Sequence, residues 1–158
     1  MAIQSGAAML ALGDQEDTTK DKYLTFLIDN EEYGVEIANI RSIISVCAIT
    51  TVPETPPFVM GIINLRGDIV PVIDVRSRFS KPLRPHDEST CIIIIEAEGS
   101  LLGLIVDTVK EVLYIGGDNV LPPPSAKLNF YNQFIKNIGR LGDRIVMLMD
   151  LERFLAQD

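Results

Sequence analysis

The 158-residue chain has no tryptophan, two cysteines and a single histidine, and these scarcities exclude several kinds of chemistry. His86 lies between Pro85 and Asp87 in a polar stretch without a nucleophile motif, which disfavours a Ser-His-Asp or Cys-His catalytic site. The cysteines do not have the spacing of zinc ligands, and the glycines do not form a phosphate-binding loop. We therefore expect no catalytic residue, no metal and no cofactor.

Long apolar runs and a basic N-terminal segment are also missing. No run approaches the roughly 18 apolar residues of a membrane span, and the apolar residues 7–12 lack the basic preface of a signal peptide. Cys47 and Cys91 each have apolar neighbours, which favours reduced, buried thiols over a disulfide, although the sequence leaves a bridge open. We expect a cytoplasmic protein without direct membrane insertion, in which residues 1–21 form a flexible tail.

Positive charge is scarce as well. The chain has 14 Lys and Arg residues against 22 Asp and Glu residues, a formal net charge of −8. Binding to phosphate backbones or to anionic lipids requires basic surface, so nucleic acid is not an expected partner. A chain of this length buries enough surface to fold without a metal or a disulfide. The composition favours a globular domain that binds other proteins.

The most informative segment that is present runs from Gly61 to Arg76 and reads GIINLRGDIVPVIDVR. Gly67-Asp68 predicts a tight turn, and the β-branched run after it predicts a strand. Pro71 has no N–H to donate, which predicts an edge strand or a bulge. Arg66 lies beside the turn, where we expect its guanidinium to be held by a carboxylate or by backbone carbonyls.

This segment has a partner near the C-terminus, which indicates an internal duplication. Residues 62–75 align with residues 138–151, and at a second constant shift residues 34–35 fall on residues 103–104. The change of shift predicts an insertion within residues 122–132. Chance is the alternative, because any two strand-turn-strand segments share apolar spacing. The first block pairs Ile62 with Ile138, Leu65 with Leu141, Ile69 with Ile145, Val70 with Val146, and Asp74 with Asp150.

The remaining patterns predict mostly strands with short connections. Apolar alternation predicts a hairpin over residues 23–35. The spacing of Ile37, Ile40, Ile43 and Ile44 predicts a short helix that leads into a strand over residues 46–52. Residues 129–137 have the spacing of another short helix, and Asp150 is expected to cap a terminal helix over residues 151–155.

The run from Ile92 to Ile95 has no polar alternation, so we expect a strand that is covered on both faces and lies between two packed layers. The charged, proline-containing residues 76–87 predict a seam. We therefore expect one domain over residues 22–158, with a first unit over about 22–86 and a second over about 87–158. Exchange of strands between the two units is possible.

Four segments in order carry a family resemblance: EEYGVEI at 31–37, GIINLRGDIVPVIDVR at 61–76, LLGLIVDTVKEVL at 101–113 and GRLGDRIVMLMDLERFL at 139–155. Together they resemble the chemotaxis coupling protein family, CheW, over residues 22–156. The resemblance implies a mainly β fold with short helices, in which two five-stranded SH3-like β-barrels pack on a shared hydrophobic core. It also implies a cytoplasmic adaptor without catalytic activity at membrane-associated receptor arrays. Its partners would be the regulatory domain of the histidine kinase CheA and the cytoplasmic tips of methyl-accepting chemotaxis proteins.

The resemblance also implies a receptor-binding groove, although plain core packing is the alternative at each of its positions. Arg66 matches an arginine of the family whose usual glutamate partner falls on Ser42, so the usual ion pair is in doubt. Glu36, Glu54 or carbonyl oxygens are the other candidate partners, and we expect Arg66 to hold its turn rather than to touch another protein. The groove positions fall on Ile40, Ile44, Gly61, Gly103, Val109 and Val112.

Two other readings remain open at this level. One is a coupling protein of a non-flagellar chemosensory system, with the same mechanism and other partners. The other is a small-ligand-binding β-barrel module or a small β-barrel enzyme. Incubation with purified kinase and receptor fragments separates an adaptor, which raises kinase output, from an enzyme that needs a substrate.

Overall fold

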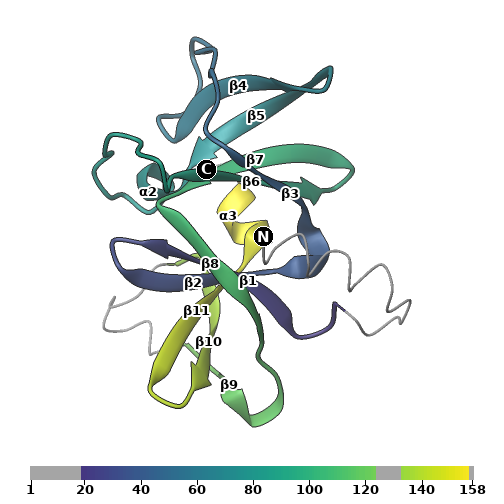
Figure 1. Ribbon diagram of the computed structural model, residues 1–158, viewed down its shortest axis with the longest axis vertical. Helices are drawn as coiled ribbons and strands as arrows, with labels where there is room; N and C mark the ends of the chain where they lie inside the picture. Colours follow the sequence, from purple (N-terminus) through teal and green to yellow (C-terminus); the bar gives the residue numbers. More distant parts are fainter. Residues whose placement is uncertain (1–18, 124–132, 157–158) are drawn as a thin grey trace. The chain divides into compact units, whose positions relative to one another are not determined.

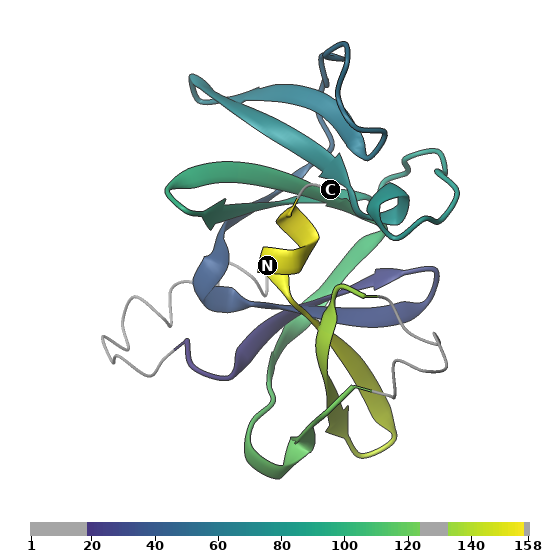
Figure 2. The same ribbon diagram turned by 180° about the vertical axis from the view of Figure 1, so that it is seen from behind.

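The computed structural model describes residues 19–123 and 133–156, and strands dominate it (Figure 1). The same strands are seen from behind in Figure 2. The strands are β1 (Lys22–Ile28), β2 (Glu31–Glu36), β3 (Ile40–Ser45), β4 (Val59–Leu65), β5 (Asp68–Asp74), β6 (Cys91–Ala97), β7 (Ser100–Val106), β8 (Thr108–Tyr114), β9 (Val120–Leu121), β10 (Ile135–Leu141) and β11 (Arg144–Met149). The helices are α2 (Val75–Arg78), α3 (Leu151–Leu155) and the 3-10 turns η1 (Ile37–Asn39) and η2 (Gly117–Asn119).

The strands form two sheets, one for each of two compact units. The first unit consists of residues 1–38 and 110–158, and its sheet has the order β8-β1-β2-β11-β10-β9. The second unit consists of residues 39–109, and its sheet has the order β3-β6-β7-β5-β4. In each sheet, two hairpins are joined by one parallel pair, β2 with β11 or β5 with β7.

Each sheet curls because the segment after one edge strand pairs with the strand at the other side. In the second unit, Thr50 follows β3 and pairs with Ile62 of β4 through two hydrogen bonds of 2.9 Å. In the first unit, β9 follows β8 and pairs with β10. β9 counts as a sixth strand, whereas Thr50 is a single bridge. Otherwise the two sheets have the same plan, as expected for two small β-barrels.

The duplication expected from the sequence is confirmed by the strand registers. Hairpins β4–β5 and β10–β11 have the same pairing at one constant shift, including a register irregularity at the same position. Hairpins β1–β2 and β6–β7 match at the second shift. The corresponding pairs include Ile63 with Val70 and Gly139 with Val146, Leu24 with Val35 and Ile93 with Leu104, and the parallel pairs Val72 with Gly103 and Leu148 with Gly34.

The two true helices are duplicated too, and each begins with an aspartate cap. The carboxylate of Asp74 accepts a hydrogen bond from the backbone N–H of Ser77 at 3.2 Å. The carboxylate of Asp150 accepts one from the N–H of Arg153 at the same distance. Such caps satisfy donors that the first turn of a helix leaves without a partner. The predicted helix over residues 151–155 and its cap are confirmed.

The apolar run in β6 is buried along its whole length. Ile92, Ile93, Ile94 and Ile95 each have 0% relative exposure, which confirms the prediction that these residues do not alternate between core and solvent. Ile92 and Ile94 belong to the core cluster of the second unit. The first unit has its own cluster, formed by Tyr23, Ile115, Val146 and Leu148.

The division into units differs from the expected halves, 22–86 and 87–158. Strands β6 and β7 come from the later half of the chain but pair with β3 and β5. Strands β1 and β2 come from the earlier half but belong to the sheet of β10 and β11. The exchange of strands that the sequence analysis allowed therefore occurs. A strand therefore belongs to the unit whose sheet it pairs with, whichever half of the sequence it comes from.

Several local predictions near β3 and β5 were wrong. Only η1, residues 37–39, has helical geometry, because residues 40–45 are drawn into a ladder with β6. The strand expected over residues 46–52 is reduced to the bridge at Thr50. β5 lies between β7 and β4 rather than at an edge, and Pro71 is tolerated because its pairing with β7 begins only at the next residue.

Two further predictions are only partly met. The helix expected over residues 129–137 lies mostly outside the described residues, and its last part, residues 135–137, is in strand β10. Cys47 and Cys91 are free thiols, but Cys47 is exposed and Cys91 is half-buried. The apolar neighbours of Cys47 in the sequence do not cover it, because it lies in the segment after β3 that forms no ladder.

Gly61 offers a direct test of the closure of the second unit. A methyl group on Gly61 would lie 2.2 Å from the carbonyl oxygen of Thr50, and the φ of Gly61 is +147°, which L side chains rarely adopt. Gly67, in the same hairpin, has φ +92° but open space around it. We expect Gly61→Ala to lower the free energy of unfolding by roughly 2–5 kcal/mol and Gly67→Ala by about 1 kcal/mol. Denaturant unfolding measures both, and equal losses would contradict the clash with Thr50.

Candidate functional site

Strand β3 carries two of the candidate receptor-binding residues, and they point to opposite faces of the sheet. Ile44 pairs with Ile92 and packs against the core cluster of the second unit. Ile40 pairs with Ile95, because the register shifts between Ile40 and Ser42. Directly opposite residues share a face of the sheet, so Ile40 lies on the face away from that cluster.

Strand β8 repeats this arrangement for the first unit. Leu113 packs against the core cluster of its unit, so its neighbour Val112 lies on the other face of the strand. Val112 and Val109 correspond in the repeat to Ile43 and Ile40, and all four are half-buried. Ile43 was not among the sequence-based candidates, although the repeat pairs it with Val112. We call Ile40, Ile43, Val109 and Val112 the outer residues of β3 and β8.

The candidate glycines have a packing role in their own unit. A methyl group on Gly103 would lie 2.9 Å from Cγ2 of Ile92, a separation that ordinary packing does not allow. Its counterpart Gly34 is enclosed in the same way, with Leu148 at 3.1 Å. The need for glycine at both places follows from the parallel strand pair beside each. The close contacts of Gly103 and Gly61 do not require a receptor to explain them.

Arg66 does not hold its turn with its side chain. Arg66 is exposed and has φ +54° in the β4–β5 turn. Among the described residues, its side chain has no hydrogen bond or ion pair, so neither Ser42 nor Glu36 nor Glu54 is its partner. The turn is held by Asn64, whose side-chain oxygen accepts a hydrogen bond from the N–H of Gly67 at 2.8 Å. The sequence-based assignment of a structural role to Arg66 is therefore corrected.

The glutamate that is absent at Ser42 is present at the corresponding position of the other unit. Glu111 of β8 occupies that position and contacts Nη2 of Arg144 at 2.6 Å. The same guanidinium binds both carboxylate oxygens of Glu32, at 2.9 and 2.6 Å. These bonds keep the pKa of Glu32 below its ordinary value, against the effect of burial, and raise the pKa of Arg144. This bidentate cluster connects β2, β8 and β11 of the first unit.

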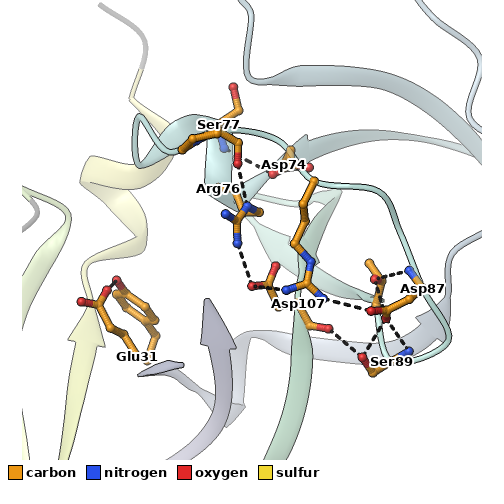
Figure 3. A network of polar contacts seen from close by, with 11 residues as sticks. Glu31, Asp74, Arg76, Ser77, Asp87, Ser89 and Asp107 are labelled. Atoms are coloured by element: carbon orange, nitrogen blue, oxygen red, sulfur yellow. Dashed lines mark hydrogen bonds and ion pairs between the residues drawn. The ribbon is translucent and has the colours of Figure 1, made fainter. Parts of the chain in front are cut away.

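The arginine that the second unit does bury is Arg76, at the start of α2 (Figure 3). Its Nη1 lies 2.8 Å from Oδ2 of Asp107, and its Nε donates to the carbonyl of Pro82 at 2.8 Å. The side chains of Arg76 and Asp107 are 9% and 10% exposed. Arg84 contacts the same carboxylate at 3.4 Å and Asp87 at 3.0 Å. The polar connection expected to be a seam is thus anchored to the end of β7.

Asp87 stabilises the end of this loop that precedes β6. Its carboxylate accepts hydrogen bonds from the N–H and the hydroxyl of Ser89, at 2.9 and 2.8 Å, and from the hydroxyl of Thr90 (Figure 3). The bonds from Ser89 come first among the causes that lower the pKa of Asp87 to about 2. The cluster brings opposite charges together and leaves no unpaired acid or base poised for proton transfer. These bonds therefore stabilise the conformation of the loop between α2 and β6.

The described residues show no arrangement that supports catalysis or metal binding. Among residues 19–123 and 133–156, no three His, Cys, Asp or Glu side chains are placed to hold a metal ion. His86 is exposed in the loop rather than placed beside a nucleophile. In that same part of the chain, no helix is long and apolar enough to cross a membrane. The outer residues of β3 and β8 stay candidate positions for binding another protein, each considered within its own strand.

Comparison with known proteins identifies relatives over nearly the whole chain. The CheW-like domain family model matches residues 22–158. The chain is 32% identical over 142 residues to the chemotaxis protein CheW of Klebsiella aerogenes, covering 90% of this chain and 86% of the relative. It is 31% identical over 145 residues to CheW of Helicobacter pylori, covering 91% and 87%.

A solved structure supports the same relationship at the level of the fold. The crystal structure of the scaffolding protein TtCheW from Thermoanaerobacter tengcongensis superposes with a TM-score of 0.78. The sequences are 34% identical, and the match covers 87% of this chain and 94% of the other. This match supports a CheW-like fold with two SH3-like subdomains, in agreement with the two sheets described above.

Arg66 and Arg76, both in the second unit, make a matched test of burial. Removing one partner of a buried ion pair leaves the other charge uncompensated, so we expect Arg76→Ala to lower the free energy of unfolding by about 3–5 kcal/mol. Arg66→Ala removes an exposed side chain and should change it by less than about 0.5 kcal/mol. Urea unfolding of both variants measures the difference. Equal losses would restore the structural role that the sequence predicted for Arg66.

The contribution of Glu32 to stability should depend on pH. Arg144 holds the folded-state pKa of Glu32 below the value of an unfolded glutamate, about 4.3. The stabilisation is therefore complete above that pH and is lost as the pH falls through the folded-state pKa. We expect the melting temperature of Glu32→Gln to lie below that of the parent above pH 5, and the gap to narrow below about pH 4. A gap that stays constant with pH would contradict the assignment.

Proposed function

The chain belongs to the CheW-like domain family and is a chemotaxis coupling protein, a scaffold without enzymatic activity, and we propose that it joins the histidine kinase CheA to methyl-accepting chemoreceptors. The resemblance of four motifs supports the kinase regulatory domain and the cytoplasmic receptor tip as its two partners. Its place would then be cytoplasmic, at membrane-associated receptor arrays. The match over residues 22–158 is the observation that carries this proposal.

The outer residues are candidates for a receptor-facing role because they are half-buried apolar side chains that neither core cluster includes, although Ile40 and Ile43 also lie beside the buried Ile95 and Ile93 of β6. Ile44 and Leu113 already supply the contacts of β3 and β8 with the two core clusters. Ile40 and Val112 remain as branched apolar side chains on the other faces of these strands, and Val109 is the counterpart of Ile40 in the repeat. The apolar face of a receptor helix is a fitting partner for such positions.

Gly61 and Gly103 fit the same proposal in a different way. Their burial and close contacts give β4 and β7 the geometry on which the surface of the second unit depends. Ile44 acts similarly, from the core side of β3. Arg66 and Ser42 are not joined by a bond, and the exposed guanidinium of Arg66 is free to contact a partner. We propose Arg66 as a partner-binding residue on this ground.

Reconstitution tests the coupling function. Purified chain is added to CheA and to receptor fragments in a defined lipid or template assembly, and kinase autophosphorylation is measured with and without each component. A coupling protein raises kinase output only when kinase and receptor are both present. An increase with kinase alone, or none with both, would refute the proposed bridge. Repeating the assay with components of a different chemosensory system identifies which one the chain serves.

Val109→Asp tests the proposed receptor-binding surface. Burying a carboxylate in an apolar interface costs several kcal/mol, whereas the half-buried Val109 position leaves it hydrated in the free chain. We expect receptor binding to weaken by at least about tenfold, which is 1.4 kcal/mol, with an unchanged far-UV circular dichroism spectrum. Lys110→Gln, at the exposed next position, changes the net charge by the same single unit and should bind like the parent.

Other outcomes of this experiment would contradict a receptor-binding role for Val109. If Val109→Asp unfolds the chain as Ile44→Asp is expected to do, the position is structural. If Val109→Asp and Lys110→Gln weaken binding equally, the effect is one of net charge. Only a loss confined to Val109→Asp in a folded chain supports a specific apolar contact.

A further inference from the structure

The chain has only two cysteines, and the fold brings both to the same end of one strand pair. Ser45, the last residue of β3, pairs with Cys91, the first residue of β6. Cys47 follows Ser45 by two residues in the segment that leaves the ladder. Both cysteines belong to the second unit, residues 39–109. Positions that are distant in sequence therefore become neighbours across β3 and β6.

The packing of neighbouring residues shows which face Cys47 occupies. Ile44 and Val46 both pack against the core cluster of the second unit, so the alternation of the strand continues beyond the end of the ladder. Ser45 and Cys47 therefore lie on the opposite face. Cys91 shares that face, because it pairs with Ser45. If β3 ran on for two more residues, the two thiols would be diagonal neighbours on one face of the sheet.

The sulfur of Cys91 has polar contacts with the backbone of Ser89 and of Val109. Its Sγ donates a hydrogen bond to the carbonyl oxygen of Ser89 at 3.4 Å. If the ladder ran on for two more residues, Ser89 would stand opposite Cys47. Cys47 is exposed and Cys91 is half-buried, and burial raises the pKa of the Cys91 thiol. An oxidant in solution therefore reaches Cys47 first.

We propose that Cys47 and Cys91 form a peroxide-sensitive thiol pair that closes to an intramolecular disulfide between the exit of β3 and the start of β6. Diagonal neighbours in a regular ladder are farther apart than the Cβ–Cβ separation of about 4 Å in a disulfide. The missing distance must come from the segment of residues 46–49, which makes no ladder hydrogen bonds that would resist the shift. This inference does not depend on the proposed binding partners.

The chemistry requires one equivalent of a hydroperoxide such as hydrogen peroxide. The thiolate of Cys47 attacks a peroxide oxygen, the O–O bond breaks, and hydroxide leaves and is protonated to water while the sulfur becomes a sulfenic acid. The thiolate of Cys91 then attacks that sulfur, the S–S bond forms and the S–O bond breaks. The second hydroxide takes up the proton lost from Cys91. Overall, two thiols and one peroxide become one disulfide and two waters.

Peptide mapping of the folded chain after treatment with hydrogen peroxide tests the pair. We expect the monomer to lose two hydrogen masses and both free thiols, with a peptide that links Cys47 to Cys91 and reverts on addition of a dithiol reductant. Cys91→Ser should accumulate a sulfenic acid at Cys47, which a dimedone probe traps. Cys47→Ser should leave the Cys91 thiol free under the same exposure. Oxidation of Cys91 before Cys47 would refute the order of events.

A geometric control decides whether the two thiols are close enough. Ser45→Cys combined with Cys47→Ser places a thiol directly opposite Cys91 in the ladder. Linkage in this control but not in the parent would show that the diagonal gap does not close, and would overturn the proposal. Linkage in neither would overturn it as well. Linkage of the parent only after unfolding in urea, or only between chains, would show that the fold does not hold the pair together.

Discussion

The close parallel pairing of one hairpin against another is the constraint on which each unit of this protein depends. Val72 faces Gly103 in the second unit, and Leu148 faces Gly34 in the first. A side chain on either glycine would meet core atoms at about 3 Å, too close for ordinary packing. Parallel strands cannot be joined by a tight turn. In the second unit, α2, a loop and β6 separate β5 from β7, whereas the first unit pairs β2 with β11 from the far end of the chain. The exchange of strands follows from this pairing.

The two units share one strand arrangement but carry different charged residues at equivalent positions. The position of Ser42 in the second unit is that of Glu111 in the first, where the carboxylate shares Arg144 with Glu32. The second unit places its buried arginine at Arg76 instead, where it anchors the loop after α2 through Asp107. Backbone registers are common to both copies, because they depend on apolar alternation and glycine. The ion pairs differ, because each depends on a single side chain.

The positions proposed to bind a partner follow from strand alternation. A strand that packs a core on one side must present the intervening residues on the other side. In β3 and β8 those residues, Ile40, Ile43, Val109 and Val112, are branched and apolar where a solvated edge strand would carry polar side chains. Apolar positions that do not serve the core of their own unit are what a scaffold needs to hold partners.

The amino-acid sequence by itself determined the mainly β class, the duplication at two shifts, the terminal helix with its Asp150 cap and the buried run at Ile92 to Ile95. These features depend on local alternation and on turn and cap residues, which act over a few positions. Only the tertiary structure decided that Arg66 is exposed while Arg76 is buried, and that Ile44 faces the core while Ile40 does not. A single register shift in β3 reverses the face of Ile40, and the partner of an arginine is chosen by strands far away in the sequence. Both depend on how strands meet, which no local pattern specifies.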